Sequence, residues 1–415
     1  MTEPFRLSSD IFKYWQIDYE TNSMKIVFQD GRALKDGLTP PESTANHYIS
    51  SSVFDWEHWW IFSTTTRGHT IITEGYNPHS PPPLNGRPSV YLDQNHWRTL
   101  ADAIHHPTGI DDPLELIAAV ELIHLAADGG IVLPLSMGHM IETSGLHGDR
   151  RYEVGVTMAS LSKGWQIRNP LDLWKWEATA TMYRHLKRPT PVMPPAISTE
   201  PGSLYESGAD LGINDRTSEN EIFMAMLTMP SVTLNSLIEP DSMPKDELNS
   251  WVDRHSRITR QINALDVPKN ERRNIARRRY WNENIAFYVR PYRALTNSLD
   301  SPIFSDRELP KLLAPSPMVG LVSELFVRRF MDKQVKWRRN DLIDMFHLSG
   351  AAAYADYVCA ESHTGTQLRT TQKALGRTQT VYTSLHDLVR AVRANGVKSI
   401  SERIGDSDSA GVELE

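Results

Sequence analysis

The chain has 415 residues, of which 40% are hydrophobic and 23% are charged, and its formal net charge is −7. These values are typical of a globular protein with a sizeable core, and the negative charge argues against a protein that coats nucleic acid over its whole surface. Cys359 is the only cysteine, which excludes an intrachain disulfide and a cysteine-based zinc cluster.

A single cysteine also favours a reducing compartment. The first ten residues hold no apolar core of signal-peptide length. No stretch approaches the run of about 18 apolar residues that a membrane span needs. We therefore expect a cytoplasmic protein without a membrane partner, and the length favours two or three modules.

Residues 1–86 are predicted to form a separate α+β appendage. Met24–Phe28 and Ile71–Thr73 are typical of strands. Between them lies an aromatic cluster, which is more often part of a core than a surface on which bases stack. Its members are Trp56, Trp59, Trp60 and Phe62. The proline-rich stretch 77–83 indicates a stiff linker after this appendage.

Residues 87–170 alternate strand and helix patterns, which indicates a parallel sheet flanked by helices. Val90–Leu92 is a short apolar run that leads directly into Asp93, and a helix is predicted from about Trp97 to His105. Ile131–Ser136 is predicted as a second buried strand. It leads into a helix that carries His139 and Glu142, and a further helix is predicted near 149–163.

Residues 171–337 are predicted to be a mainly helical insertion. The helical stretches lie near 174–186, 219–229, 245–264, 270–297 and 318–336. The strand and helix patterns resume over residues 338–400, with a helix at 340–354 and a strand at 356–360 that leads into Glu361. A strand at 379–385 and a helix at 386–394 follow, and residues 401–415 are predicted to be a disordered tail.

Carboxylates recur at comparable places in the two strand-and-helix regions. Asp93 and Glu361 each follow a predicted buried strand. Ligands of open parallel sheets bind outside the carboxyl ends of the strands. Glu142, Asp341 and Asp344 lie in helices, and the last two share a helix face. Several carboxylates brought together repel each other unless a cation lies among them, so the pattern predicts a Mg²⁺ or Mn²⁺ site.

Each acid also has a purely structural interpretation. Asp93 and Asp341 can cap the helices that begin beside them. Glu142 can be an exposed helix residue, and Glu361 can pair with a nearby base. His347 is expected to support the site by packing or hydrogen bonding, because the other expected ligands are all oxygens.

Four stretches together resemble the PIN-like domain, a fold of metal-dependent ribonucleases. They are Tyr91–Trp97, Leu133–Glu142, Asn340–Leu348 and Asp356–Glu361. The resemblance covers residues 89–164 and 338–396. It implies a PIN-like parallel sheet flanked by helices, with the appendage and the helical insertion added to it.

The resemblance also implies roles for single residues. Asp93, Glu142, Asp344 and Glu361 match the acids that hold the metal, and Asp341 competes with Asp344 for its place. Asn95 matches a polar residue that binds the substrate. The family usually has Asp where this chain has Glu361, and the longer side chain shifts the metal or the water.

Basic residues are expected to bind the phosphates of RNA. One run of arginines lies in 271–279, and a second basic run, 328–339, leads to the helix of Asp341 and includes Arg338 and Arg339. Arg150 and Arg151 follow Glu142 and can clamp a phosphate. The alternative is that these cations lie on solvated helix faces and pair with acids.

The sequence thus predicts an endoribonuclease that uses divalent metal ions, with RNA as its substrate and with a homo-oligomer or an inhibitor as a further partner. A phosphohydrolase with Asp93 as nucleophile is disfavoured, because it needs a second Asp where this chain has Asn95. A non-catalytic nucleic-acid-binding or scaffold protein on the same fold is the other alternative.

Overall fold

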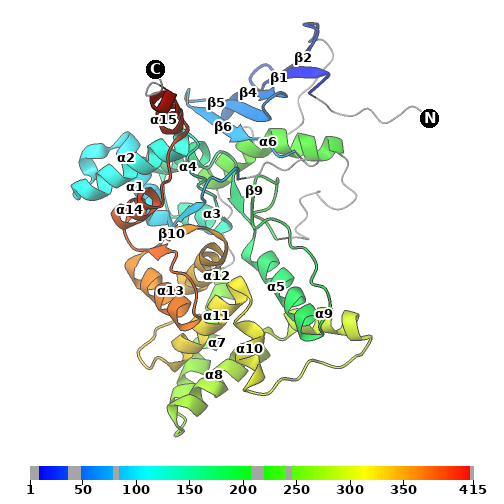
Figure 1. Ribbon diagram of the computed structural model, residues 1–415, viewed down its shortest axis with the longest axis vertical. Helices are drawn as coiled ribbons and strands as arrows, with labels where there is room; N and C mark the ends of the chain where they lie inside the picture. Colours follow the sequence, from blue (N-terminus) through cyan, green and yellow to red (C-terminus); the bar gives the residue numbers. More distant parts are fainter. Residues whose placement is uncertain (1–8, 36–47, 78–83, 207–218, 240–244, 412–415) are drawn as a thin grey trace. The chain divides into compact units, whose positions relative to one another are not determined.

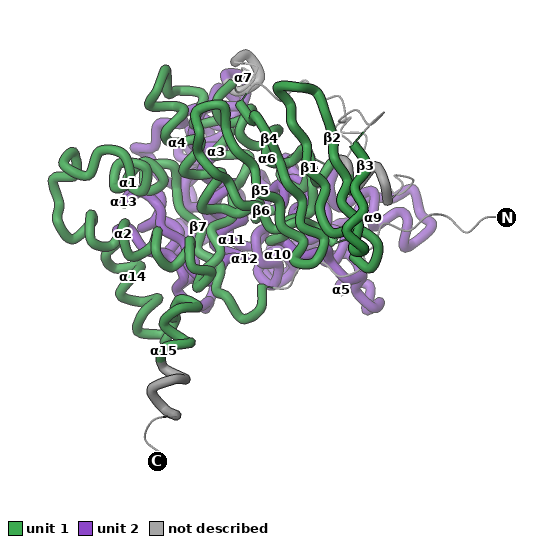
Figure 2. Tube along the Cα trace, turned by 90° about the horizontal axis from the view of Figure 1, so that it is seen from above, with its two compact units in different colours: residues 1–167, 197–242, 385–415 green, residues 168–196, 243–384 purple. Residues whose placement is uncertain are grey.

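The computed structural model describes residues 9–35, 48–77, 84–206, 219–239 and 245–411, and it has a mixed α/β architecture (Figure 1). The chain divides into two compact units (Figure 2). Unit 1 holds residues 1–167, 197–242 and 385–415, and unit 2 holds residues 168–196 and 243–384. Within the described ranges, no helix combines the length and the apolar character that a membrane crossing requires.

Six antiparallel strands form a sheet in unit 1, in the order β3-β2-β1-β4-β5-β6. They are β1 (Phe12–Asp18), β2 (Ser23–Phe28), β3 (Ala33–Leu34), β4 (Ile49–Asp55), β5 (Trp60–Thr65) and β6 (Thr70–Glu74). Trp15 pairs with Phe54, and Phe54 pairs with Ile61. Because side chains alternate along a strand, these three buried residues share one face of the sheet.

Helix α6 (Glu219–Ile238) covers that face (Figure 1). The ring of Phe223 stacks on Trp56 with centroids 4.6 Å apart, and Met226 and Leu227 complete the same core. The expectation of a self-contained α+β appendage therefore needs correction. The described part of residues 1–86 contains strands without an α-helix, and a helix about 145 residues further along the chain covers them.

The aromatic cluster is divided between the two faces of this sheet. Trp56 is fully buried, as predicted for a core residue, whereas Trp60 is 43% exposed on the opposite face. The alternation along β5 explains the difference, because Trp60 and Ile61 are neighbours and point to opposite sides.

The remaining strands of unit 1 are short. Strand β7 (Val90–Leu92) is fully buried, as predicted. The predicted strand Ile131–Ser136 is buried but pairs only through two isolated parallel bridges, Ser89 with Val132 and Leu135 with Gln166. Pro134 has no N–H group, so this segment cannot extend a regular ladder. Strands β8 (Gln166–Ile167) and β9 (Ile197–Ser198) pair in the antiparallel sense.

Besides α6, the helices of unit 1 are α1 (Gln94–His105), α2 (Pro113–Ala127), α3 (Met137–Thr143), α4 (Gly148–Ser162), α14 (Leu385–Ala394) and α15 (Ile400–Gly411), with a 3₁₀ turn at Pro107–Gly109. Helix α15 corrects the prediction of disorder from residue 401 onward, and residues 412–415 lie outside the described residues.

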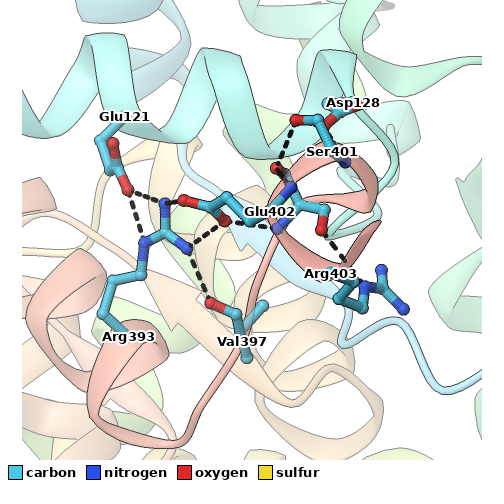
Figure 3. A network of polar contacts seen from close by, with 8 residues as sticks. Glu121, Asp128, Arg393, Val397, Ser401, Glu402 and Arg403 are labelled. Atoms are coloured by element: carbon cyan, nitrogen blue, oxygen red, sulfur yellow. Dashed lines mark hydrogen bonds and ion pairs between the residues drawn. The ribbon is translucent and has the colours of Figure 1, made fainter. Parts of the chain in front are cut away.

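Two carboxylates anchor the start of α15 (Figure 3). Asp128 accepts hydrogen bonds from the backbone N–H and the hydroxyl of Ser401, at 2.8 and 2.5 Å. Glu402 accepts two hydrogen bonds from the guanidinium of Arg393, at 2.8 and 2.9 Å, and Arg393 also pairs with Glu121 of α2. These contacts explain why residues 400–411 form a helix although their polar composition predicts disorder.

The anchor of α15 is expected to weaken in acid. Hydrogen bonds from Ser401 lower the pKa of Asp128 from 3.8 to about 2, and those from Arg393 lower the pKa of Glu402 from 4.5 to about 2. Because both values are lowered on folding, the stabilisation is present above the unfolded values and is lost as the pH falls toward 2. NMR shifts of the Ser401 and Glu402 amides during an acid titration measure this loss.

The double variant Asp128→Asn with Glu402→Gln serves as the control, because it lacks the two carboxylates whose pKa values are lowered at the anchor. It should show weakened anchoring already at neutral pH and no further change on acidification. Unchanged amide shifts of the native protein down to pH 2 would contradict the prediction.

Unit 2 is mainly helical. It contains residues 171–196 and 243–337 of the predicted insertion and also residues 338–384, which the sequence predicts as part of the second strand-and-helix region, whereas residues 197–242 belong to unit 1. Its helices are α5 (Pro170–His185), α7 (Lys245–Asn263), α8 (Lys269–Asn284), α9 (Ala286–Thr296), α10 (Glu308–Leu313), α11 (Pro317–Met331), α12 (Arg339–Tyr354) and α13 (Ser362–Ala374). The stretch 270–297, predicted as one helix, forms the two helices α8 and α9. Strands β10 (Tyr357–Cys359) and β11 (Val381–Tyr382) pair in the parallel sense.

Helix α11 forms the centre of unit 2. Twelve of its fifteen residues are buried, and it packs against α5, α7, α8, α10, α12 and α13. A helix that starts inside a core needs partners for its first N–H groups. The carboxylate of Glu177, on α5, accepts hydrogen bonds from the N–H groups of Met318 and Val319 at 2.7 and 2.8 Å, and a third one from the hydroxyl of Tyr354.

Arg377 secures the turn before α11 by donating to the carbonyl oxygens of Ala314 and Ser316 at 2.8 and 2.7 Å. Burial raises the pKa of the Glu177 carboxyl, and the two amides and the nearby guanidinium favour its charged form. The start of α11 is thus held by one buried anion and one half-buried cation.

Replacing Glu177 by Ala is expected to lower the free energy of unfolding of unit 2 by about 3 kcal/mol, because two buried N–H groups lose their acceptor. Glu177→Gln should cost less, since the amide oxygen still accepts. Chemical denaturation measures both. Glu271→Gln, at an exposed site on α8, removes the same charge and should change stability by less than about 0.5 kcal/mol.

Candidate active site

Asp93 is positioned by the end of a strand and the start of a helix. It follows β7 directly, and its Oδ1 accepts a hydrogen bond from the backbone N–H of Gln94 at 2.8 Å, which makes it the N-cap of α1. The capping interpretation of Asp93 is therefore confirmed. Capping occupies one carboxylate oxygen and does not by itself exclude a second role for this side chain.

Two buried hydrogen bonds connect α3 to the residues on either side of Asp93. The imidazole Nε2 of His139 donates to the carbonyl oxygen of Leu92 at 2.7 Å. The Nε2 of Gln94 donates to the hydroxyl of Thr143 at 3.0 Å. His139 and Thr143 lie on α3 on either side of Glu142, so this helix and the strand end that carries Asp93 are held together.

Both ring nitrogens of His139 take part in hydrogen bonds that hold α3 in place. Its Nδ1 accepts a hydrogen bond from the backbone N–H of Ser136 at 3.0 Å, which leaves Nε2 as the donor. The ring also stacks on Tyr91, with centroids 5.0 Å apart. Neither ring nitrogen is therefore available to a metal ion. Glu142 is half-buried near the end of α3, and Asn95 is exposed in the first turn of α1.

The other predicted acids belong to unit 2. Asp341 pairs with Arg329 and accepts a hydrogen bond from the backbone N–H of Arg338. Arg338 is the N-cap residue of α12, so the predicted N-cap role of Asp341 is wrong in position, although its carboxylate belongs to the capping box from the third helical position. Asp344 is half-buried one turn further along α12. Glu361 is exposed and is the N-cap residue of α13, directly after Ala360.

Helix α12 packs against both β10 and α13, so Asp344 and Glu361 lie on neighbouring elements of unit 2. Burial lowers the pKa of His347 to about 4, which leaves its imidazole neutral at physiological pH. Among the residues that the structure describes, no three His, Cys, Asp or Glu side chains form a group that could hold a metal ion. Asp93 and Glu142 lie in unit 1, and the other three acids lie in unit 2.

Most of the predicted basic residues have structural partners. Arg150 pairs with Asp102 at 2.5 Å. Arg151 donates to the carbonyl oxygens of Ser144 and Ile238 at 2.8 and 3.0 Å. Arg339 donates to Asn249 at 2.7 Å, and Arg338 precedes α12 with an exposed side chain.

The basic run 271–279 is also paired with acids. Arg273 contacts Glu324, Arg278 contacts Asp306, and Arg279 contacts Glu283. In the second run, Arg328 pairs with Glu324 at 2.9 Å. The interpretation as paired helix faces is thus confirmed for these arginines.

The two hydrogen bonds that connect α3 to β7 and α1 were not predicted from the sequence. Gln94 directly follows Asp93, and Thr143 directly follows Glu142, but nothing in the sequence indicates that their side chains meet.

No protein-family model matches the chain, and no curated protein or solved structure shows significant similarity to it.

Replacing Asp93 by Ala is expected to lower the free energy of unfolding by about 1 kcal/mol, because α1 loses its N-cap. Asp93→Asn should change stability by only a few tenths of a kcal/mol, since Asn caps about as well as Asp. Thermal and chemical denaturation of the two variants measure this difference. An equal loss in both variants would mean that the charge of Asp93, rather than its capping oxygen, stabilises the fold.

Proposed function

We propose that the chain is a divalent-metal-dependent endoribonuclease that hydrolyses phosphodiester bonds of RNA through Asp93, Glu142, Asp344 and Glu361. The observation that carries this proposal is the pair of buried hydrogen bonds between α3 and the residues beside Asp93. Catalytic groups need supports that are themselves fixed by packing and hydrogen bonds. His139 and Gln94 are such supports, because both are about 1% exposed.

The positions of the acids in their own units also support the proposal. Asp93 directly follows β7, and Glu361 follows β10 after a single alanine. Asp344 lies on a helix that packs against β10. The order of these elements resembles that of the PIN-like domain, and we propose this fold for the chain. We also propose that Asp344, rather than Asp341, holds the metal.

The donor set fits Mg²⁺ or Mn²⁺, because it consists of carboxylate oxygens, and both ring nitrogens of His139 are engaged in hydrogen bonds. When bound, such an ion lowers the pKa of a water ligand and stabilises negative charge on a phosphate group. The chain itself would contribute rigid placement of Asp93 and Glu142. Asn95, Arg150, Arg151, Arg338 and Arg339 remain proposed contacts to RNA.

A second function is a nucleic-acid-binding or scaffold protein that keeps the PIN-like fold without catalysis. The observation that favours it is the structural use of the acids, because Asp93 and Asp341 both take part in helix caps. The presence of Glu361 in place of an Asp points in the same direction. A homo-oligomer or an inhibitor stays a proposed partner, and the buried Cys359 supports a reducing compartment such as the cytoplasm.

The decisive experiment is cleavage of labelled single-stranded RNA with Mg²⁺ or Mn²⁺. The native protein should cleave and EDTA should stop it. Asp93→Asn, Glu142→Gln and Asp344→Asn should each lower the rate by about 100-fold or more, because each removes a charge that holds the metal. Asp93→Asn is the most informative of the three variants, because it removes the charge but keeps the N-cap of α1 and therefore the stability of the fold.

Asp356→Asn is the matched control. Asp356 is exposed and precedes β10, so it lies at the opposite end of that strand from Glu361 and its loss should leave cleavage unchanged. RNA binding without cleavage under all metal conditions would favour the scaffold function. Absence of both binding and cleavage would refute both proposals.

A further inference from the structure

A pocket in unit 2 combines positive charge with a rigid wall. It encloses about 520 Å³ between α7 and the connection 332–338 that joins α11 to α12. Three exposed cations line it, namely Arg260, Lys333 and Lys336, together with the hydroxyl-bearing residues Ser256 and Thr259. The lining contains no acidic residue.

These cations differ from the arginines of unit 2 that pair with acids. Arg273, Arg278 and Arg329 each contact a carboxylate. For Arg260, Lys333 and Lys336, no acidic side chain lies within ion-pairing distance in the described part of the chain. In a protein of net charge −7, three such cations around one pocket form a local site for an anion.

The wall of the pocket is held by an aromatic cluster. The indole N–H of Trp337 donates to the hydroxyl of Thr259 at 2.8 Å and so connects the 332–338 segment to α7. Trp337 packs at right angles to Trp251, with centroids 5.2 Å apart, and the guanidinium of Arg329 lies 4.6 Å from its ring centre. The pocket is therefore shaped before a ligand arrives, which reduces the entropic cost of binding.

A second, smaller pocket adjoins the first. It encloses about 220 Å³ and shares Val335 with the first pocket. Its lining includes the uncharged polar side chains Thr366, Gln367 and Thr370 of α13, together with Arg328, Arg329 and Asp332. Both arginines are paired with acids, so the second pocket offers mainly hydrogen-bonding groups beside one carboxylate, which suits the sugar or base groups of a ligand whose phosphate lies in the first pocket.

We propose that the two pockets bind consecutive nucleotides of a single RNA strand, with the phosphates at Arg260, Lys333 and Lys336. This inference rests on the proposed function for the identity of its ligand, which is RNA. It adds three cations that bind the RNA phosphates without a metal ion. A pocket of this volume accepts one nucleotide-sized group at a time. A duplex presents its phosphates on a broad rod and needs an extended surface instead.

The test is binding of a labelled single-stranded oligouridylate in EDTA, measured by fluorescence anisotropy at several salt concentrations. The pocket variant combines Arg260→Gln, Lys333→Gln and Lys336→Gln. Each phosphate contact to a single strand contributes about 0.7 to the slope of log affinity against log salt. The pocket variant should therefore lose about 2 from this slope and bind about tenfold or more weakly at moderate salt.

The control variant combines Lys269→Gln, Arg307→Gln and Lys311→Gln, three exposed cations of unit 2 outside both pockets. It has the same net charge as the pocket variant and should bind like the native protein. Equal weakening of both variants, or native affinity of the pocket variant, would overturn the inference. So would competition by uridine monophosphate or by duplex RNA as effective as that by the unlabelled oligonucleotide.

Binding in EDTA is independent of catalysis, so the two proposals can fail separately. If the native protein binds through the pocket but cleaves no RNA with either metal, the pocket inference stands and the nuclease proposal fails. If it cleaves RNA while the pocket variant binds normally, the nuclease proposal stands and the pocket inference fails.

Discussion

Unit 2 depends on bringing the N-terminus of a helix into its core. Helix α11 is buried along most of its length, and its first N–H groups cannot reach water. Glu177 solves this by accepting from Met318 and Val319, and Arg377 satisfies the carbonyl groups just before them. This buried carboxylate therefore connects α5 to the start of α11 and, through the hydroxyl of Tyr354, to the end of α12.

The other end of α11 determines where the exposed cations lie. Arg329, near its C-terminus, pairs with Asp341 and lies over Trp337. These contacts fix the connection to α12, on which Lys333 and Lys336 are carried. Asp341 therefore shapes the cationic pocket from a distance, which gives this acid a clear purpose that requires no metal.

Sequence periodicity predicted most of the helices, and it also predicted the buried strand that runs into Asp93. It did so because apolar spacing is a local property. It failed where the deciding contact is distant. Nothing near Met24 shows that Phe223 will cover the strand, and the polar stretch after Ile400 gives no sign that Asp128 and Arg393 hold it. For the site, the positions of the acids were predictable, whereas the bond from Gln94 to Thr143 was not, because two ordinary polar residues carry no pairing signal.

The recruitment of α6 has a consequence for synthesis of the chain. The antiparallel sheet leaves the ribosome with Trp15, Phe54 and Trp56 on a face that residues 219–238 cover in the folded protein. At translation rates of about 5–20 residues per second, the gap of about 145 residues corresponds to a delay of roughly 7–30 s. During that interval the nascent chain exposes a row of aromatic side chains, and transiently exposed apolar surface of this kind promotes aggregation. A fragment that ends before residue 219 would carry the same uncovered face permanently.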